Sequence, residues 1–337
     1  MGTEHRVGLM KHVQVMGTRA WLLACTVAIG IIIGIMGTAT AQAEKLSVVA
    51  TTGMIADAAQ AVGGKHVEVR SLMGPGIDPH AYRQTRTDIV ALGKADLVLW
   101  HGLYLEAQME EFLSKLSERQ AVIAVAESLP IERLIAHDDY ADKFDPHVWM
   151  VPELWAQVVE TIETALIDIK PEAEAEFSRN ADAYTDEILA LGTYTRATLE
   201  SVPAEQRVLV TAHDAFNYFG DAYGFEVVGI QGISTESEAG VNRIGELVDL
   251  LADRQIGAVF VESSVSDRNI RALIEGAASV GHEVTIGGEL FSDAMGEPGT
   301  YEGTYLGMID HNATTIGRAL GGNAPELGRL GQLSAGS

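Results

Sequence analysis

From Lys45 onwards, short apolar runs alternate with stretches in which apolar residues recur at helical spacing. In the first half of the chain, the apolar runs predict strands at 46–50, 66–72, 95–100 and 121–125. The stretches between these runs predict helices at 54–62, 85–92 and 105–116. Strands that alternate with helices are typical of a largely parallel sheet with helices on both faces.

The same alternation returns in the last part of the chain. It predicts strands at 207–211, 226–230, 258–262 and 283–286, with helices at 215–223, 241–254 and 267–279. Between the two regions, Pro152 begins a helix that continues to 169, and Pro171 begins another that continues to about 199. This second helix is roughly 30 residues long, or about 45 Å at 1.5 Å per residue. Such a length predicts a stiff connection between two lobes.

These patterns predict an α/β fold of two lobes, each with a mainly parallel sheet flanked by helices, joined by one long helix. We expect an N-terminal lobe at residues 44–170, the linking helix at 171–201 and a C-terminal lobe at 202–337. Open parallel sheets bind ligands beyond the carboxyl ends of their strands. The loops that follow the strands are therefore the expected place for chemistry.

The first 43 residues have the composition of a secretory signal peptide. Arg6, Lys11 and Arg19 precede an apolar run at 21–36, and the small-residue sequence Ala41-Gln42-Ala43 comes after it. We expect cleavage after Ala43 and export of the mature protein. A retained membrane anchor is the alternative, because the apolar run approaches the lower length limit of a spanning helix.

The mature chain is expected to be acidic and free of cysteine. Cys25 lies within the apolar run rather than after it, which argues against lipid attachment, and its removal excludes disulfides and thiolate metal sites. The full chain has 23 Lys and Arg against 47 Asp and Glu, a formal charge of −24. Cleavage removes three basic residues and one acidic residue, which gives −26. This charge argues against nucleic acid or anionic lipid as partners and attracts cations, although solubility alone also explains it.

Two copies of the tripeptide Asp-Pro-His stand in predicted loops, at Asp78-Pro79-His80 and Asp145-Pro146-His147. Proline keeps the preceding residue extended and fixes its own backbone angle, so each copy presents its imidazole from a preset loop. His213 and Asp293 lie in loops that follow two predicted strands of the second region. Three neutral imidazoles and one carboxylate suit a four-coordinate divalent metal.

Each of these residues also has an ordinary structural explanation. Asp78 or Asp293 would cap a helix, and His80 would be merely exposed. His213 would share a capping role with Asp214. Glu262, which ends the predicted strand 258–262, is either a solvated residue or one that orients a metal ligand from behind.

The other histidines of the mature chain stand alone in the sequence. His137 lies among acidic residues, where it is an accessory or delivery ligand or no ligand at all. The rest are expected to be surface or capping residues, namely His66, His101, His282 and His311.

The chain carries five short motifs in a characteristic order and spacing. They are Gly-Ile-Asp-Pro-His-Ala-Tyr at 76–82, Asp-Pro-His-Val-Trp at 145–149, Thr-Ala-His-Asp-Ala-Phe at 211–216, Val-Glu-Ser-Ser at 261–264 and Leu-Phe-Ser-Asp at 290–293. With these motifs the chain, from Lys45 to about Leu320, resembles the metal receptors of bacterial zinc and manganese ABC importers, of the TroA-like and ZnuA-like type. The resemblance implies that metal lies in a cleft between two lobes. It implies His80 and His147 as ligands from the first lobe, and His213 and Asp293 from the second.

Two departures from the pattern of this family bear on the metal. In manganese-type relatives a glutamate commonly stands where this chain has His213, which favours zinc. Many zinc-type relatives carry a long histidine-rich loop before the second ligand, where this chain has only residues 136–144. The second departure argues against a high-capacity role in scavenging zinc.

The resemblance implies a monomeric periplasmic receptor that captures a divalent metal, Zn²⁺ in preference to Mn²⁺, and delivers it to a membrane permease. The rival is an exported zinc-dependent hydrolase, for which Glu262 would be the base. A catalytic zinc usually keeps three protein ligands and one open position, so a fourth ligand in Asp293 favours the receptor. The residues of the chain neither support nor exclude a role as an adhesin. Because imidazole must be neutral to bind metal, we expect the affinity to fall below about pH 6.5.

Overall fold

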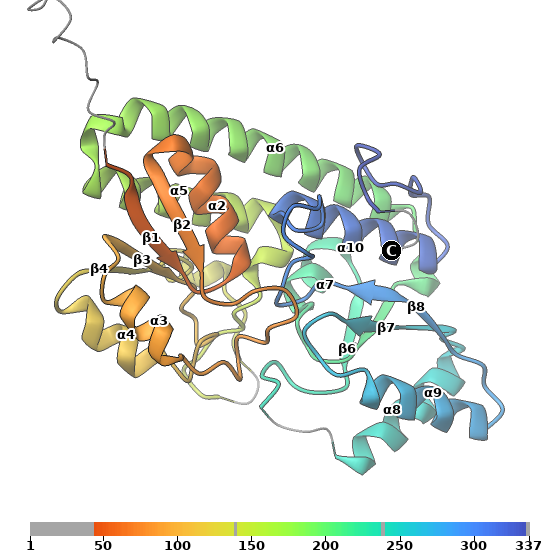
Figure 1. The fold of residues 1–337 in the computed structure, drawn as a ribbon. Helices are drawn as coiled ribbons and strands as arrows, with labels where there is room; N and C mark the ends of the chain where they lie inside the picture. Colours follow the sequence, from red (N-terminus) through yellow and green to blue (C-terminus); the bar gives the residue numbers. More distant parts are fainter. Residues whose placement is uncertain (1–43, 138–139, 237–239, 335–337) are drawn as a thin grey trace, which may run out of the picture. The chain divides into compact units, whose positions relative to one another are not determined.

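The computed structural model describes residues 44–137, 140–236 and 240–334. The expected signal peptide, with Cys25 and the cleavage site after Ala43, lies outside these ranges, so it stays a prediction. Within the described ranges, no helix combines the length and the apolar character needed to cross a membrane. The chain from Lys45 onwards forms one unit by its contacts. Within it, two α/β lobes are seen (Figure 1).

The first lobe is built on a four-stranded parallel sheet. In spatial order its strands are β2 (Val67–Ser71), β1 (Leu46–Ala50), β3 (Leu97–Trp100) and β4 (Ala121–Ala124). Its connecting helices are α2 (Gly53–Gly63), α3 (Arg86–Leu92) and α4 (Glu110–Ser117). β3 is buried along its whole length, as a continuous apolar run in a covered parallel sheet predicts.

The second lobe contains two parallel strand pairs, β5 with β6 and β7 with β8, and β5 lies against β7. The strands are β5 (Val208–Thr211), β6 (Glu226–Gly229), β7 (Ala258–Glu262) and β8 (Thr285–Leu290). The helices between them are α7 (Asn217–Tyr223), α8 (Val241–Arg254) and α9 (Arg268–Ser279). The predicted two-lobe α/β fold with parallel sheets is thus confirmed.

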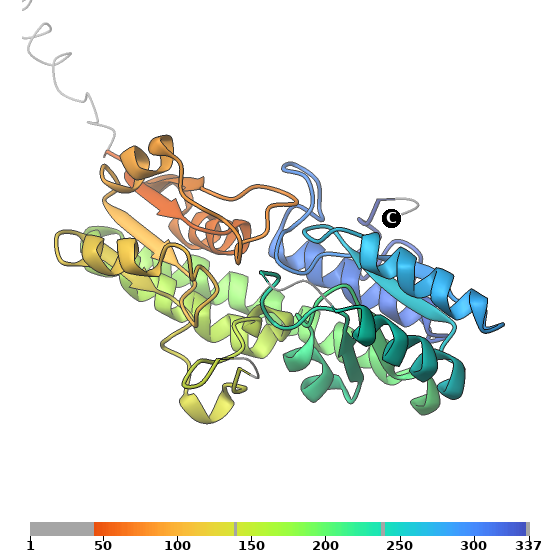
Figure 2. The ribbon, with the colours of Figure 1, turned by 90° about the horizontal axis from the view of Figure 1, so that it is seen from below.

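Three longer helices lie alongside the lobes, and Figure 2 shows them from below. They are α5 (Pro152–Ile169), α6 (Glu174–Glu200) and α10 (Tyr305–Ala319). α6 has 27 residues, which corresponds to about 40 Å. It packs against α2 and α5 on the side of the first lobe, and against α7 and α10 on the side of the second (Figure 1). A single apolar core continues along these helices from Val48 to Leu320, so the lobes share buried surface.

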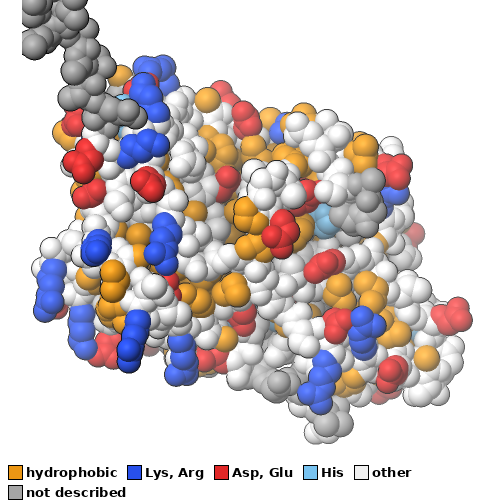
Figure 3. Space-filling model, in the orientation of Figure 1, with side chains coloured by type: hydrophobic (Ala, Val, Ile, Leu, Met, Phe, Trp, Pro, Cys, Tyr) orange, Lys and Arg blue, Asp and Glu red, His pale blue; other side chains and the backbone are white. Residues whose placement is uncertain are grey.

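The net negative charge is spread over the surface. On the face drawn in Figure 3, acidic side chains occur on both lobes, whereas most basic side chains lie on the first lobe.

The helix α4 begins later than the sequence pattern predicts. The pattern starts at 105, whereas α4 starts at Glu110. The intervening residues form turns, because Gly102, Leu103 and Tyr104 all have positive φ values, 81°, 52° and 72°. The carboxylate of Glu106 accepts hydrogen bonds from the backbone N–H groups of His101 and Gly102 and holds this turn.

The end of the chain differs most from the prediction. β8 continues to Leu290 through Gly288, although two adjacent glycines suggest a break. A Cβ atom at Gly288 would lie 2.4 Å from Cγ2 of Thr315, so glycine lets α10 approach the strand. The helix α10 itself is not predicted from the sequence pattern, because nearly every residue from Tyr305 to Gly317 is buried. A helix buried on all sides lacks the polar stripe that reveals helical spacing.

Candidate metal centre

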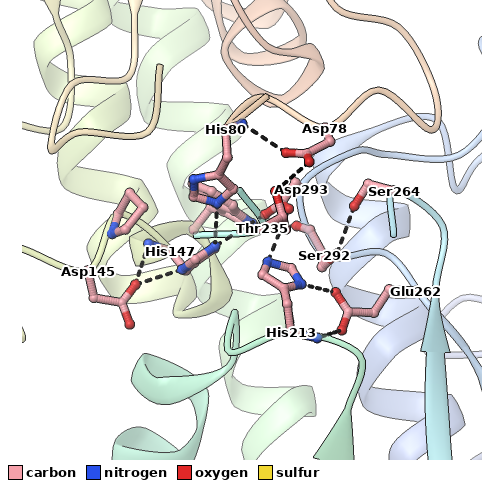
Figure 4. Close-up of polar contacts among 12 residues, drawn as sticks. Asp78, His80, Asp145, His147, His213, Thr235, Glu262, Ser264, Ser292 and Asp293 are labelled. Atoms are coloured by element: carbon pink, nitrogen blue, oxygen red, sulfur yellow. Dashed lines mark hydrogen bonds and ion pairs between the residues drawn. The ribbon is translucent and has the colours of Figure 1, made fainter. Parts of the chain in front are cut away.

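The four predicted ligands come together at the carboxyl ends of strands. His80 lies in the loop after β2, and His147 directly precedes the short helix η3 (Val148–Met150). His213 follows β5, and Asp293 follows β8. One ligand atom from each of the four lies within 4.8 Å of the others, and all four side chains are buried. Each lobe therefore contributes two residues to one buried cluster (Figure 4).

The distances within the cluster match those around a small cation. The Nε2 atoms of His80 and His147 are 3.4 Å apart. His147 Nε2 lies 3.2 Å from Asp293 Oδ1, and His213 Nε2 lies 3.2 Å from Asp293 Oδ2. Ligand atoms at about 2.0–2.1 Å from a tetrahedral zinc ion are about 3.3 Å from one another. The nitrogen and oxygen atoms thus surround a position that one divalent ion fits.

Hydrogen bonds do not satisfy the atoms at the centre of the cluster. His213 Nε2 and both carboxylate oxygens of Asp293 are buried, and none of the three forms a hydrogen bond with the described residues, although the imidazoles of His147 and His213 lie 3.2 Å from Asp293. Buried polar atoms without a partner are rare, and each calls for an explanation. A cation bound between these atoms would satisfy all three.

Both Asp-Pro-His loops are held by the same local contact. Asp78 Oδ1 accepts a hydrogen bond from the backbone N–H of His80 at 2.8 Å, and Asp145 Oδ1 accepts one from His147 at 2.9 Å. Asp78 does not cap a helix, since Thr85 caps the next helix, α3. Aspartate and proline together therefore fix the direction of each imidazole from within its own tripeptide.

Two carboxylates orient histidines of the cluster from behind. Asp145 Oδ1 lies 2.7 Å from His147 Nδ1, and Glu262 Oε2 lies 2.5 Å from His213 Nδ1. Glu262 Oε1 also accepts the backbone N–H of His213 at 2.8 Å. Glu262 is 3% exposed, so it is not a solvated residue. A carboxylate bonded to Nδ1 leaves Nε2 of each ring free for a metal.

Residues of α7 hold the carboxyl group and the backbone of Asp145. Asn217 Nδ2 donates to Asp145 Oδ2 at 3.1 Å, and the Tyr218 hydroxyl donates to the backbone carbonyl of Asp145 at 3.0 Å. The residue that precedes α7 at its N-cap is Phe216, so His213 and Asp214 do not have the capping role that we considered as an alternative. A second-lobe helix thus supports a first-lobe ligand loop.

Trp149 links the two ligand loops across the lobes. Its indole Nε1 donates to the carbonyl of Ser292 at 2.8 Å, immediately before Asp293. Its ring packs edge-on against His147, with centroids 5.2 Å apart. Its own carbonyl accepts a hydrogen bond from the hydroxyl of Tyr305 at 2.9 Å. The positions of a first-lobe and a second-lobe ligand are therefore coupled through one side chain.

The expectation that His101 is a surface or capping residue is wrong. Its side chain is fully buried, and Nε2 donates to the carbonyl of Pro146 at 2.7 Å, between Asp145 and His147. Its ring also packs edge-on against Trp149 at 4.9 Å. The position of His101 directly after β3, at the strand end where ligands gather, is the signal that could have identified it.

The remaining histidines lie away from the cluster. His311 is also buried rather than exposed, and its Nε2 donates to the carbonyl of Glu289. His282 bonds the carbonyl of Ile256, and His66 pairs with Glu176. His137 packs against Tyr140, with centroids 4.8 Å apart. Its acidic neighbours at 138–139 are outside the described residues, so an accessory role stays a prediction.

Opposite charges dominate the electrostatics of the cluster. Burial opposes the charge of His147, yet Asp145 and Asp293 raise the pKa of its imidazole to about 9. Burial likewise opposes the charge of His213, but Glu262 and Asp293 raise its pKa well above the usual value. Among the described residues no carboxylate bonds the ring of His80, and burial lowers its pKa to about 3 although the more distant Asp293 acts in the opposite direction. Burial disfavours the charge of Asp293, but the adjacent histidines hold its pKa well below the usual range.

The arrangement suits binding rather than catalysis. The four converging side chains could supply all four ligands of a metal, and Glu262, which could have served as a base, already bonds His213 with both oxygens. A two-lobed α/β fold with a closed cluster of three histidines and one aspartate between its lobes defines a receptor for a divalent metal.

The comparisons with known proteins identify the family. The model of ZnuA, described as the periplasmic component A of the zinc-uptake complex, matches residues 48–319, and the chain belongs to this family. It is thus a metal-binding receptor of the ABC-importer type and not a hydrolase, and one relative, from Streptococcus sanguinis, is named as a metal ABC transporter substrate-binding lipoprotein.

The relatives are named for different metals. The chain is 51% identical over 277 residues to the manganese-binding lipoprotein MntA of Bacillus subtilis, covering 82% of this chain and 90% of the relative. It is 45% identical over 306 residues to the zinc-binding protein TroA of Treponema pallidum, covering 90% and 99%. A solved structure of that periplasmic zinc-binding protein superposes with a TM-score of 0.80 at 47% identity, covering 82% of this chain and 99% of that one.

Proposed function

We propose that this protein captures a divalent metal through His80, His147, His213 and Asp293, prefers zinc to manganese, and delivers the ion to a membrane permease. The observation that carries the proposal is the buried, converging set of three imidazole nitrogens and one carboxylate, in which His213 Nε2 and both Asp293 oxygens lack hydrogen-bond partners among the described residues. Such a set leaves a bound divalent ion with a net charge near +1, which the two carboxylates behind the histidines further offset.

The preference for zinc rests on the kinds of donor atom. Imidazole suits zinc, whereas manganese prefers oxygen ligands, and the Irving–Williams order also places zinc above manganese. Manganese is the second candidate, because the relative named for manganese is 51% identical and the one named for zinc is 45% identical. Identity at this level does not separate the two metals, so the donor set is the better guide.

Substitution of each ligand tests the site. We expect His80→Ala, His147→Ala, His213→Ala or Asp293→Ala to lower zinc affinity by more than the roughly 10–100-fold typical of outer residues around a metal. His137→Ala serves as the control and should leave the affinity unchanged. Calorimetric titration of the mature protein measures the effect. Unaltered zinc binding by His213→Ala would contradict this assignment.

The choice of metal is tested by a change of donor at one position. His213→Glu replaces an imidazole by a carboxylate and should shift the ratio of zinc to manganese affinity towards manganese. Competition between the two ions, measured for the parent and the variant, gives this ratio. In cells, deletion of the gene followed by metal supplementation in chelator-treated medium identifies the transported ion. Rescue by manganese and not by zinc would refute the physiological preference while leaving the ligand assignment intact.

The remaining parts of the proposal concern location and assembly. We propose a monomer that works in the periplasm after cleavage behind Ala43, with lobes at 44–170 and 202–337 and a link at 171–201. The sequence Ala41-Gln42-Ala43 supports this cleavage site. Mass spectrometry of the protein from its native source should give an N-terminus at Glu44. An acylated N-terminus at Cys25 would contradict it.

A further inference from the structure

His80 is held differently from the other two histidines of the cluster. His147 is oriented by Asp145 of its own loop, and His213 by Glu262 of its own lobe. The backbone of His80 is held by Asp78 Oδ1, and the second oxygen of Asp78 accepts a hydrogen bond from the hydroxyl of Thr235 at 2.5 Å. Thr235 belongs to the loop after β6, in the opposite lobe (Figure 4).

The same second-lobe loop contacts the first lobe at a second point. Glu236 Oε1 accepts a hydrogen bond from Gln108 Nε2 at 2.7 Å. The loop of His80 also passes close to the other lobe, since a Cβ atom at Gly76 would lie 3.4 Å from the carbonyl oxygen of Ser263. The contacts of Thr235 and Glu236 join the lobes through residues that lie outside the metal cluster itself. Such contacts exist only while the lobes are close together.

We propose that Thr235 is a positioning residue that acts through Asp78 to hold His80 in place, and that it sets how long the metal stays bound. This inference rests on the proposed function. Loss of the hydroxyl would free one oxygen of Asp78 and loosen the backbone of His80, the ligand whose ring lacks a carboxylate behind it. His80 is then the first ligand to leave when the cleft opens.

The inference predicts an effect on release and not on capture. The hydrogen bond between Thr235 and Asp78 forms after the lobes have closed, so its loss leaves the open state that receives the metal unchanged. A hydrogen bond to a charged group contributes enough that its loss should accelerate release about tenfold. Changes within one complex generally appear in the dissociation rate rather than the association rate.

Stopped-flow measurement on the mature protein tests this inference. Zinc is released from the loaded protein into excess chelator, and its uptake by the metal-free protein is followed separately. Thr235→Val should release zinc about tenfold faster and take it up at the parent rate. Thr235→Ser keeps the hydroxyl and should behave like the parent. The melting temperature of each metal-free variant should match that of the parent, which separates positioning from a general loss of stability.

The outcomes separate this inference from the proposed function. If the parent binds zinc and Thr235→Val releases it at the parent rate, Thr235 has no such role and the receptor function stands. Equal acceleration in Thr235→Ser and Thr235→Val would also refute the role of the hydroxyl. If the parent binds neither zinc nor manganese, both the proposed function and this inference are refuted. Gln108→Ala removes the neighbouring contact to Glu236 and keeps that of Thr235, so release at the parent rate by this variant supports the role of Thr235, and acceleration equal to that of Thr235→Val contradicts a specific role.

Discussion

Glu262 illustrates how one side chain governs the chemistry of a ligand. It holds the backbone N–H and the Nδ1 of His213 with separate oxygens, so it fixes both the place and the tautomer of that imidazole. Asp145 contacts the backbone N–H and the Nδ1 of His147 within a single tripeptide, but it does so through one oxygen, Oδ1. The donor strength of the two rings therefore depends on carboxylates that do not touch the metal position.

Replacement of Glu262 by glutamine should weaken metal binding without removing a ligand. Glu262→Gln preserves shape but loses the negative charge that makes His213 a stronger donor, so we expect a 10–100-fold lower zinc affinity. Calorimetry of the variant measures this. Glu205→Gln, at an exposed glutamate, is the matched control and should have no effect. An equal affinity for Glu262→Gln and the parent would show that orientation of His213 does not need the charge.

The dependence of metal affinity on pH should begin at a higher pH than unperturbed histidines suggest. In the metal-free protein the pKa of His147 is raised to about 9 and that of His213 is also raised, so both rings carry protons at neutral pH. A metal must displace these protons, which means that affinity falls as pH falls through about 9. His80, with its pKa lowered to about 3, does not compete in this range.

Titrations at several pH values measure this dependence. As pH falls below about 9, the logarithm of the affinity should fall by about one for each unit of pH through the proton on His147, and more steeply where His213 also holds its proton. The raised pKa values therefore predict that the affinity begins to fall at a higher pH than the value of about 6.5 expected for unperturbed histidines. A constant affinity from pH 8.5 to 7, followed by a decline at lower pH, would restore the simpler expectation.

At the scale of elements, the turn between β3 and α4 depends on a buried carboxylate. Glu106 accepts hydrogen bonds from the Thr51 hydroxyl and from the backbone of His101 and Gly102, and no cation neutralises it among the contacts of the described residues. Burial outweighs these donors and raises the pKa of Glu106 to about 7. The turn places the side chain of His101 against the loop that contains His147.

The raised pKa makes the stability of the protein depend on pH in a definite direction. Below about pH 4.5 both the folded and the unfolded states hold the proton of Glu106, and the group makes no difference. As pH rises from about 4.5 to about 7, the unfolded state loses the proton and the folded state keeps it. The free energy of unfolding should therefore fall across this window, by up to ~3 kcal/mol, and level off above it.

Urea unfolding of the metal-free protein at pH 5 and at pH 8 tests this dependence. Glu106→Gln removes the titrating group and should reduce the difference between the two pH values. Glu68→Gln, at an exposed residue of β2, should keep the parent difference. If Glu106→Gln and the parent lose the same stability between pH 5 and pH 8, ionisation of Glu106 is not the cause.

At the scale of the whole molecule, the two lobes are tied together beside the metal centre. The hydrogen bond from Trp149 Nε1 to the Ser292 carbonyl joins residues 143 positions apart in sequence. The nearby Trp155 is equally buried and stacks on Tyr305, but its Nε1 has no hydrogen-bond partner in the described part of the chain. The two tryptophans therefore offer a matched pair, alike in burial and unlike in hydrogen bonding.

Substitution of each tryptophan by phenylalanine separates the hydrogen bond from the volume of the ring. Trp149→Phe leaves the buried carbonyl of Ser292 unpaired, so it should cost about 1–3 kcal/mol more stability than Trp155→Phe. It should also lower zinc affinity, because Ser292 precedes Asp293. Denaturant unfolding and calorimetry measure the two effects. Equal losses for the two variants would show that packing alone matters at Trp149.

Much of the fold follows from local features of the sequence. α5 starts at Pro152 and ends at Ile169 as predicted, because proline is favoured in the first turn of a helix and the apolar spacing is regular. The conformation of the two Asp-Pro-His loops is also set locally, because each aspartate accepts a hydrogen bond from a backbone N–H only two residues away. Such features depend on neighbouring residues, so the sequence alone determines them.

The tertiary structure decides what depends on residues distant in sequence. Glu262 meets His213 across 49 positions and Thr235 meets Asp78 across 157, and neither pairing has a local signal. The helix α10 is buried on nearly all sides, so its environment and not its pattern makes it a helix. The raised pKa values of His147 and His213 likewise arise only when charges from both lobes are brought together in a buried site, where they interact strongly.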